Sequence, residues 1–292
     1  MKKMTKSRLL IYIVTGVFAF MCLIPFLLVL GGSFTDEQEI RSEGYKLVPK
    51  QFSLKAYQLL FIEPRFVVNA YTVSIIVTFA GTAFGLMFCA MLAYPISLKR
   101  FRLRKALSLY VILTLLFNGG MVSWYIITVN FLRLKNNILA LIIPMLVNGF
   151  NVMLIRNYFE TIPDEMHESA KIDGAGDILT FFRIILPLST PVLATVSLFI
   201  ALGYWNDWWL GIMLIDNSDL QPLQILLRSI VSNINFLKNS EEGARMIDPN
   251  RLIPAEGVKL ATCIVTIGPI IFAYPFVQRY FVKGIMLGAV KN

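Results

Sequence analysis

The chain alternates long apolar stretches with shorter polar segments. Six stretches free of Asp, Glu, Lys and Arg are each about 20 residues long or longer, which is enough for an α-helix to cross a bilayer. The pattern predicts an all-α polytopic membrane protein with six transmembrane helices in a single domain over 1–292. The predicted spans cover about 9–31, 67–95, 106–128, 137–155, 187–212 and 258–281.

Two of the polar segments are long and carry turn residues. They cover 33–65 and 213–257. A short helix is expected over 53–61, and apolar residues at helical spacing predict a second helix over 220–237 that is too polar to span. Pro254 and Glu256 are typical of a helix start before the last span. The segment 213–257 is either a solvated connection or a docking surface.

Lys and Arg in the short segments indicate the orientation. The N-terminal tail holds four of them, the 99–105 loop holds five, and neither contains an acid. Both therefore belong in the cytoplasm, and alternation places both termini inside and the segments 33–65 and 213–257 outside. The first apolar stretch is longer than the roughly 7–15 residues of a signal-peptide core, so an uncleaved anchor is expected.

Composition agrees with a membrane protein. Apolar residues make up 57% of the chain and charged residues only 15%, with a net charge of +9. Soluble domains carry about 25% charged residues, and disordered chains are poor in aromatic residues. An ordinary soluble enzyme, a disordered chain and a nucleic-acid partner are therefore not expected.

The segment 160–186 between the fourth and fifth spans is rich in cap and turn residues. Thr161 is a candidate N-cap, with Pro163 in the first turn of a helix of about ten residues. Gly174 can end that helix in a left-handed conformation, and Asp177 can cap a second helix. Pro187 would open or kink the next span. The sequence predicts a short helix–turn–helix at the cytoplasmic membrane surface.

This segment resembles the EAA signature of ABC-importer permeases, which is Glu-Ala-Ala, three residues, Gly, nine residues and Ile-x-Leu-Pro. Only the middle Ala departs, and it is replaced by another small residue. The matching positions are Glu168-Ser169-Ala170, three residues, Gly174, nine residues and Ile184-Ile185-Leu186-Pro187.

Two further segments resemble MalG-type permeases of carbohydrate importers. They are Trp205–Trp209 and the tail over 274–292. The tail is most similar to complex-oligosaccharide importers, a subgroup that includes a permease subunit of bacterial alginate importers. The resemblance implies a type I ABC importer permease in the bacterial inner membrane.

The resemblance also implies partners and a mechanism of alternating access. These partners are a second related permease in a heterodimer, two ATP-binding subunits, an extracytoplasmic solute-binding protein and an oligosaccharide. The loop 160–186 would form the coupling helix, in which Glu168 pairs with a basic residue of the ATPase, Ala170 permits close approach and Gly174 makes the turn. The tail 283–292 would make a second contact with the ATPase. The implied coupling residues are Glu168, Ser169, Ala170, Asp173, Gly174, Leu186 and Pro187.

Several kinds of site are missing from the sequence. No Gly-x-x-x-x-Gly-Lys-Ser/Thr motif occurs, and His167 is the single histidine. We therefore expect no catalytic site, bound cofactor or metal in this chain, with ATP and Mg²⁺ held by the separate ATPase subunits.

The substrate pathway is less sharply marked. Asp207 is the single acid in a predicted span, and a charge there is costly and usually functional. The neighbouring tryptophans form either an aromatic belt at the outer interface or a surface for sugar rings. The candidate residues are Asn148, Asn151, Trp205, Asn206, Asp207 and Trp208.

Other functions remain open. A permease of the same class could import amino acids, phosphate or metal ions. A secondary transporter would need no ATPase, but would usually show inverted repeats or several buried charges, and neither is seen. A membrane enzyme would need a nucleophile and a base side by side, and no such pattern is present.

Overall fold

A computed structural model describes residues 6–239, 254–268 and 271 of the chain. These residues are helical apart from their connections, with one isolated antiparallel bridge between Thr35 and Phe52. The predicted all-α fold is confirmed. The contacts divide the chain into two compact units, which we call the terminal unit (1–67 and 227–270) and the central unit (68–226 and 271–292).

The terminal unit joins residues from both ends of the sequence. Its helices are α1 (Lys6–Ser33), α2 (Glu37–Glu43), α3 (Lys55–Leu60), most of α14 (Leu223–Asn239) and a helix over 255–268. Ala56 of α3 packs with Ile234 of α14 and with Ala255, Val258 and Ala261. The helices expected over 53–61 and 220–237 are thus present, and a helix follows Pro254 directly, as predicted.

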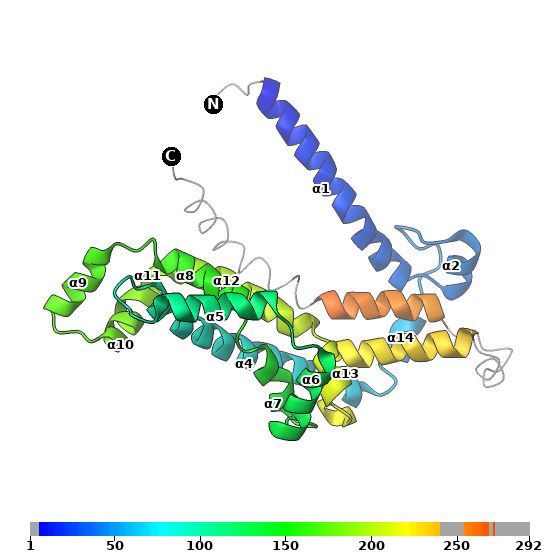
Figure 1. Ribbon diagram of the computed structural model, residues 1–292. Coiled ribbons are helices and arrows are strands. Elements are labelled where there is room, and N and C mark those ends of the chain that lie inside the picture. Colours follow the sequence, from blue (N-terminus) through cyan, green and yellow to red (C-terminus); the bar gives the residue numbers. More distant parts are fainter. Residues whose placement is uncertain (1–5, 240–253, 269–270, 272–292) are drawn as a thin grey trace. The chain divides into compact units, whose positions relative to one another are not determined.

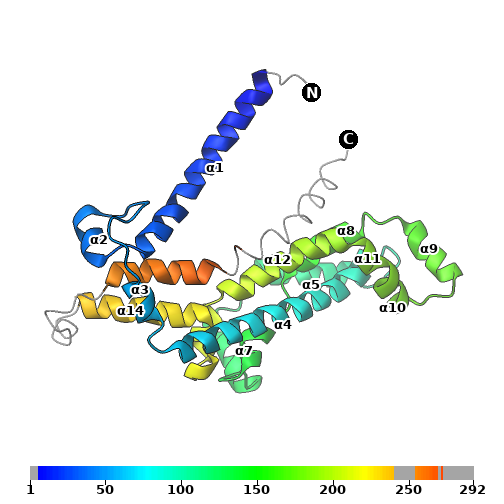
Figure 2. The ribbon, with the colours of Figure 1, turned by 180° about the vertical axis from the view of Figure 1, so that it is seen from behind.

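The central unit is a helical bundle that carries a hairpin at one end (Figure 1). Its elements are α4 (Pro64–Ser97, mostly in this unit), α5 (Arg104–Leu116), α6 (Met121–Ile126), η1 (Ile127–Phe131), α7 (Ile138–Ile142), η2 (Ile143–Met145), α8 (Gly149–Phe159), α9 (Asp164–Ile172), α10 (Asp177–Thr180), η3 (Phe181–Ile185), α11 (Leu186–Leu188), α12 (Thr190–Asn206), α13 (Trp209–Leu214) and η4 (Ser218–Leu220). Both views show α4, α5, α8 and α12 running alongside one another, with α9 and α10 beyond their shared end (Figure 2).

Close backbone approach holds this bundle together at Gly81 of α4. A Cβ atom there would lie 2.4 Å from the ring of Tyr204 on α12. The Tyr204 hydroxyl in turn donates a buried 2.7 Å hydrogen bond to the carbonyl of Ile142. One turn along, a Cβ on Gly85 would lie 3.0 Å from the carbonyl oxygen of Leu146. Small residues four apart allow such contacts in membrane helices.

Two unbroken helices are long and apolar enough to span a membrane, Leu9–Ser33 and Pro64–Ser97. Three bent pairs bring the total to at most five within the described residues. The sixth predicted span begins in the helix over 255–268, and its residues after 271 lie outside the described part.

The predicted spans over 106–128, 137–155 and 187–212 contain breaks. The sharpest is a bend of 113° between Arg104–Leu116 and Met121–Phe131. Gly120 there has φ +81°, and its N–H donates to the Asn118 side chain at 2.9 Å. The Asn-Gly-Gly sequence supplies this turn, which apolar content alone does not reveal.

Candidate functional site

The hairpin of α9 and α10 is positioned by its turn residues. α9 begins at Asp164 after Pro163, with Asp164 and Glu165 in its first turn and Lys171 in its last, which suits the helix dipole. Thr161 was expected to cap this helix, and that expectation is wrong. Its hydroxyl instead donates to the carbonyl of Tyr158 at 2.7 Å, within the turn that ends α8.

Gly174 ends α9 as predicted. It has φ +78°, its N–H donates to the carbonyl of Lys171, and the N–H of Ala175 donates to the carbonyl of Ala170. This pair of bonds is the Schellman arrangement, which needs a left-handed residue and so favours glycine. α10 follows with Gly176 as its N-cap. Asp177, expected as the cap, is the first helical residue instead.

The two faces of α9 differ in exposure. Glu168, Ser169 and Asp173 at its C-terminal cap are exposed, whereas His167 and Ala170 face the rest of the unit. Ala170 is only 3% exposed. The small side chain of Ala170 therefore lets α9 pack closely against the rest of the central unit. The expectation was that Ala170 would permit the close approach of an ATPase.

Aromatic contacts attach the inner face of α9 to the bundle. The ring of Tyr94 stacks on that of His167 at 5.9 Å between centroids and lies 5.1 Å from Phe181 and 6.4 Å from Phe159. Burial lowers the pKa of His167 below its ordinary value. The surrounding charges act in both directions: Arg100 and Lys171 lower this pKa, and Asp164 and Asp177 raise it.

The basic loop between α4 and α5 contacts the hairpin through ion pairs. Lys99 pairs with Asp164 of α9 at 3.0 Å, and Arg100 pairs with Asp177 of α10. Arg104 pairs with Glu160, after the end of α8, and donates to the carbonyl of Ile96 at 2.9 Å. Lys99 also lowers the pKa of Asp164.

These ion pairs were not predicted from the sequence. The available signal was charge: the 99–105 loop has five cations and no acid, whereas 156–183 has six acids and three basic residues. The contacts place both loops at the same end of the central unit.

The tip of the hairpin is apolar and open. Ile172 is 86% exposed and Ile178 is 78% exposed, on either side of the Gly174 turn. Exposed apolar side chains beside acids are typical of a protein-binding surface. Leu186 and Pro187 lie further on in α11, just before a bend of 83° into α12.

The pathway candidates lie on α8 and around the end of α12. Asn148 caps α8 by accepting from the N–H of Phe150, and Asn151 is buried. Trp205 is buried beside Tyr71, and the Asn206 side chain donates to the carbonyl of Leu202.

Asp207 follows α12 at a helix break. Its carboxylate accepts from the N–H of Leu210 at 3.2 Å and so helps to start α13. Trp208 is exposed. The structure thus gives Asp207 a local structural role at the start of α13.

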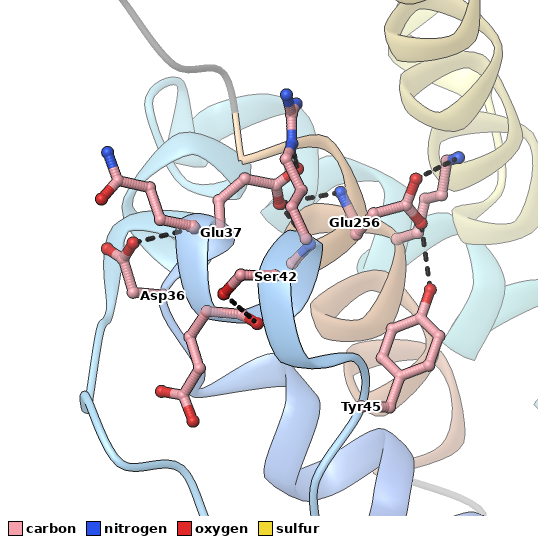
Figure 3. Close-up of polar contacts among 10 residues, drawn as sticks. Asp36, Glu37, Ser42, Tyr45 and Glu256 are labelled. Atoms are coloured by element: carbon pink, nitrogen blue, oxygen red, sulfur yellow. Dashed lines mark hydrogen bonds and ion pairs between the residues drawn. The ribbon is translucent and has the colours of Figure 1, made fainter.

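The terminal unit brings together the two segments predicted to lie outside. Glu37, only 4% exposed, accepts from the N–H groups of Glu256 and Gly257 at 3.1 and 3.2 Å and pairs with Arg41 (Figure 3). The Tyr45 hydroxyl donates to the Glu256 carboxylate, and Asp36 caps α2 (Figure 3).

A second buried carboxylate acts in the same way nearby. Glu39 accepts from the N–H groups of Gln51 and Lys50 at 2.9 and 3.1 Å. These two bonds, with the charges of Lys46 and Lys50, hold its pKa below the ordinary value.

The tail over 283–292, which was expected to contact the ATPase, lies outside the described residues. No three His, Cys, Asp or Glu side chains of the described part converge to hold a metal ion.

Comparison with known proteins gives consistent matches. The family model described as binding-protein-dependent transport system inner membrane component matches residues 5–287. The chain is 39% identical over 270 residues to protein LplC of Bacillus subtilis (strain 168), covering 92% of this chain and 90% of LplC. It is 38% identical over 292 residues to the polygalacturonan/rhamnogalacturonan transport system permease protein YtcP of the same organism, covering 98% and 100%.

A solved structure matches as well. It is the crystal structure of a bacterial ABC transporter involved in the import of the acidic polysaccharide alginate. One of its chains aligns with a TM-score of 0.81 at 29% identity, covering 96% of this chain and 100% of that chain.

Proposed function

The chain belongs to the family of binding-protein-dependent transport system inner membrane components, and we propose that it forms one half of the membrane pathway of an oligosaccharide importer. It is an ABC importer permease with the type I permease fold. The other half would be a second, related permease, and two separate subunits would bind and hydrolyse ATP with Mg²⁺. A solute-binding protein would deliver the sugar.

The hairpin carries this proposal. Its outer face presents Glu168 and Ser169, its tip presents Ile172 and Ile178, and its inner face is fixed to the bundle. Such a surface suits a groove of an ATPase subunit, where the isoleucines are buried and Glu168 meets a cation. Asp173 and Gly174 set the turn that presents them.

Force on the hairpin reaches the spans through the contacts already described. Tyr94 of α4 touches α9, and the basic loop joins α9 and α10 to both α4 and α5. Leu186 and Pro187 connect the hairpin to α12 across the 83° bend. When the ATPases close, movement of the hairpin would therefore turn these helices and open the pathway to the other side.

The orientation follows from the basic loop. Its five cations and those of the N-terminal tail put both in the cytoplasm, together with the hairpin. Segments 33–65 and 213–257 would then face outward and receive the binding protein.

Oligosaccharide is the proposed substrate class because YtcP is named for polygalacturonan and rhamnogalacturonan and the solved transporter for alginate. Trp205 and Trp208 would supply faces for sugar rings, and Asn148, Asn151, Asn206 and Asp207 would supply hydrogen bonds to hydroxyls.

The decisive experiment is purification of the tagged chain with its native partners, followed by uptake in proteoliposomes. We expect co-purification of a second permease and an ATPase, and uptake of neutral or uronate oligosaccharides that requires both ATP and the binding protein. Gly174→Asp should abolish coupled uptake while the complex still inserts, because the left-handed turn at Gly174 is lost.

Gly176→Asp is the matched control. It adds the same charge two residues away, where φ is −72° and an aspartate can cap α10. Uptake that persists without ATP would replace the proposal with a secondary transporter. Normal uptake by Gly174→Asp would remove the hairpin from the coupling mechanism.

A further inference from the structure

A cavity of about 780 Å³ opens in the central unit beside the root of the hairpin. Its wall is made by the basic loop, the first turns of α5 and one residue of α8. The lining residues are Lys99, Arg100, Phe101, Arg102, Arg104, Lys105, Ser108, Leu109, Ile112 and Arg156.

Positive charge dominates this wall. Six of the ten lining residues are Lys or Arg, and three nearby carboxylates pair with four of them. The cavity therefore keeps a surplus of three positive charges. Arg102 and Lys105 are exposed and form no ion pair with any described residue, so they are available to an anion.

A buried hydroxyl lines the same cavity. Ser108 is only 9% exposed, and its Oγ has no hydrogen-bond partner among the described residues. Buried hydroxyls are normally hydrogen-bonded. The Oγ of Ser108 is closed to solvent, so recognition of an anion in this cavity rests on the cations.

An apolar stripe leads away from the cations along α5. Leu109 and Ile112 line the cavity, and Leu113 and Leu116 continue the same flank at helical spacing. All four side chains are exposed on this chain. Because α5 starts a predicted span, the cations lie at the end of an apolar flank suited to acyl chains.

We propose that this cavity binds the head group of an anionic phospholipid, with an acyl chain along the stripe of α5. Arg and Lys side chains bind the phosphate oxygens. Inorganic phosphate offers the same oxygens but no acyl chain, so the stripe favours the lipid. A lipid here would neutralise Arg102 and Lys105 next to the cations that pair with the hairpin.

The test measures lipid binding to the purified complex by native mass spectrometry. The probes are dioleoyl phosphatidylglycerol and, for comparison, dioleoyl phosphatidylcholine. Each Lys or Arg near an anionic lipid surface contributes to the binding free energy. The loss of two such contributions weakens binding about thirty-fold. Arg102→Gln/Lys105→Gln should therefore bind phosphatidylglycerol about thirty-fold more weakly and phosphatidylcholine unchanged.

Three further variants make the result specific. Arg65→Gln removes an exposed cation outside the cavity and should leave binding unchanged. Arg102→Lys/Lys105→Arg keeps the charge and should retain binding, which separates charge from misfolding. Ser108→Ala removes a hydroxyl that is closed to solvent and should leave phosphatidylglycerol binding unchanged.

Three results would overturn the proposal. Equal binding of the two lipids, or unchanged phosphatidylglycerol binding by Arg102→Gln/Lys105→Gln, would show that these cations do not recognise a lipid. If inorganic phosphate displaces phosphatidylglycerol completely from the complex, the cavity is a site for a free anion.

Discussion

Carboxylates join segments both at the hairpin root, where the 99–105 loop meets α9 and α10, and in the region around α2, but their partners differ. At the hairpin root, Asp164 and Asp177 meet side-chain cations at the surface. Around α2, Glu37 and Glu39 are buried and accept from backbone N–H groups. The same functional group thus joins two segments in two different ways.

The difference concerns how firmly each region is held. An exposed ion pair contributes little and is screened by salt, since water solvates both charges when they separate. A buried carboxylate cannot leave its N–H partners without stranding them away from water. We infer that the hairpin root can adjust during transport, whereas the α2 region keeps its shape.

Glu37→Ala should have the largest effect. It strands the N–H groups of Glu256 and Gly257, at a cost of about 1–3 kcal/mol in local stability. Hydrogen exchange over 255–262 should speed up accordingly. Glu43→Ala, which removes an exposed partner of Lys46 and Lys50, is the control and should leave this exchange unchanged. Equal effects of the two variants would contradict the comparison.

Gly174→Ala should have the second-largest effect. A Cβ in the left-handed conformation costs roughly 1–2 kcal/mol, so exchange in α9 should speed up and coupled ATPase activity should fall. Gly176→Ala has ordinary backbone angles and open space around it and should do neither. If both variants behave alike, the turn conformation is not what matters.

Acid should loosen the hairpin before the α2 region. The pKa of His167 is lowered in the fold, so its contribution is complete above about pH 6.5 and declines as pH falls below that value. The pKa of Glu39 is also lowered, so its contribution declines only below the ordinary glutamate range, near pH 4.3. Hydrogen exchange corrected for intrinsic rates, from pH 8 to pH 3, measures both.

His167→Phe keeps a ring against Tyr94 and removes the titrating group. In this variant, the loosening of α9 near pH 6 should vanish, while the change around Gln51 at lower pH remains. Simultaneous loosening of both regions in the native chain would refute the distinction.

Lys99→Gln should have the smallest effect. The side chains of Lys99 and Asp164 are 77% and 65% exposed, so their pair is largely screened. Exchange in α9 should stay within experimental error of the native chain, at low and at high salt. A change as large as that of Gly174→Ala would show that surface charge holds the hairpin.

Much of the fold could be predicted because the bilayer imposes a simple rule on sequence. Apolar length located α1 and α4, and turn chemistry located Gly174 and the helix after Pro254. The bend at Gly120 was missed because apolar length does not distinguish a straight helix from a broken one. The cap predicted at Thr161 was wrong for a local reason, because its hydroxyl donates to the carbonyl of Tyr158 in the turn that ends α8.

The candidate site could be predicted as a segment, but not as a set of contacts. The spacing around Gly174 located the hairpin, but it could not show that Ala170 faces inward. Which side of α9 faces inward depends on Tyr94 and Phe181, which are distant in the sequence. The role of Asp207 at the start of α13 likewise depends on where α12 ends.

The way in which Glu37 and Glu39 are bonded has a consequence for sequence variation. Their partners are backbone N–H groups, which every residue except proline possesses. The side chains at 50, 51 and 256 can therefore be exchanged while these backbone hydrogen bonds remain. One scaffold could in this way present differently composed surfaces to different binding proteins.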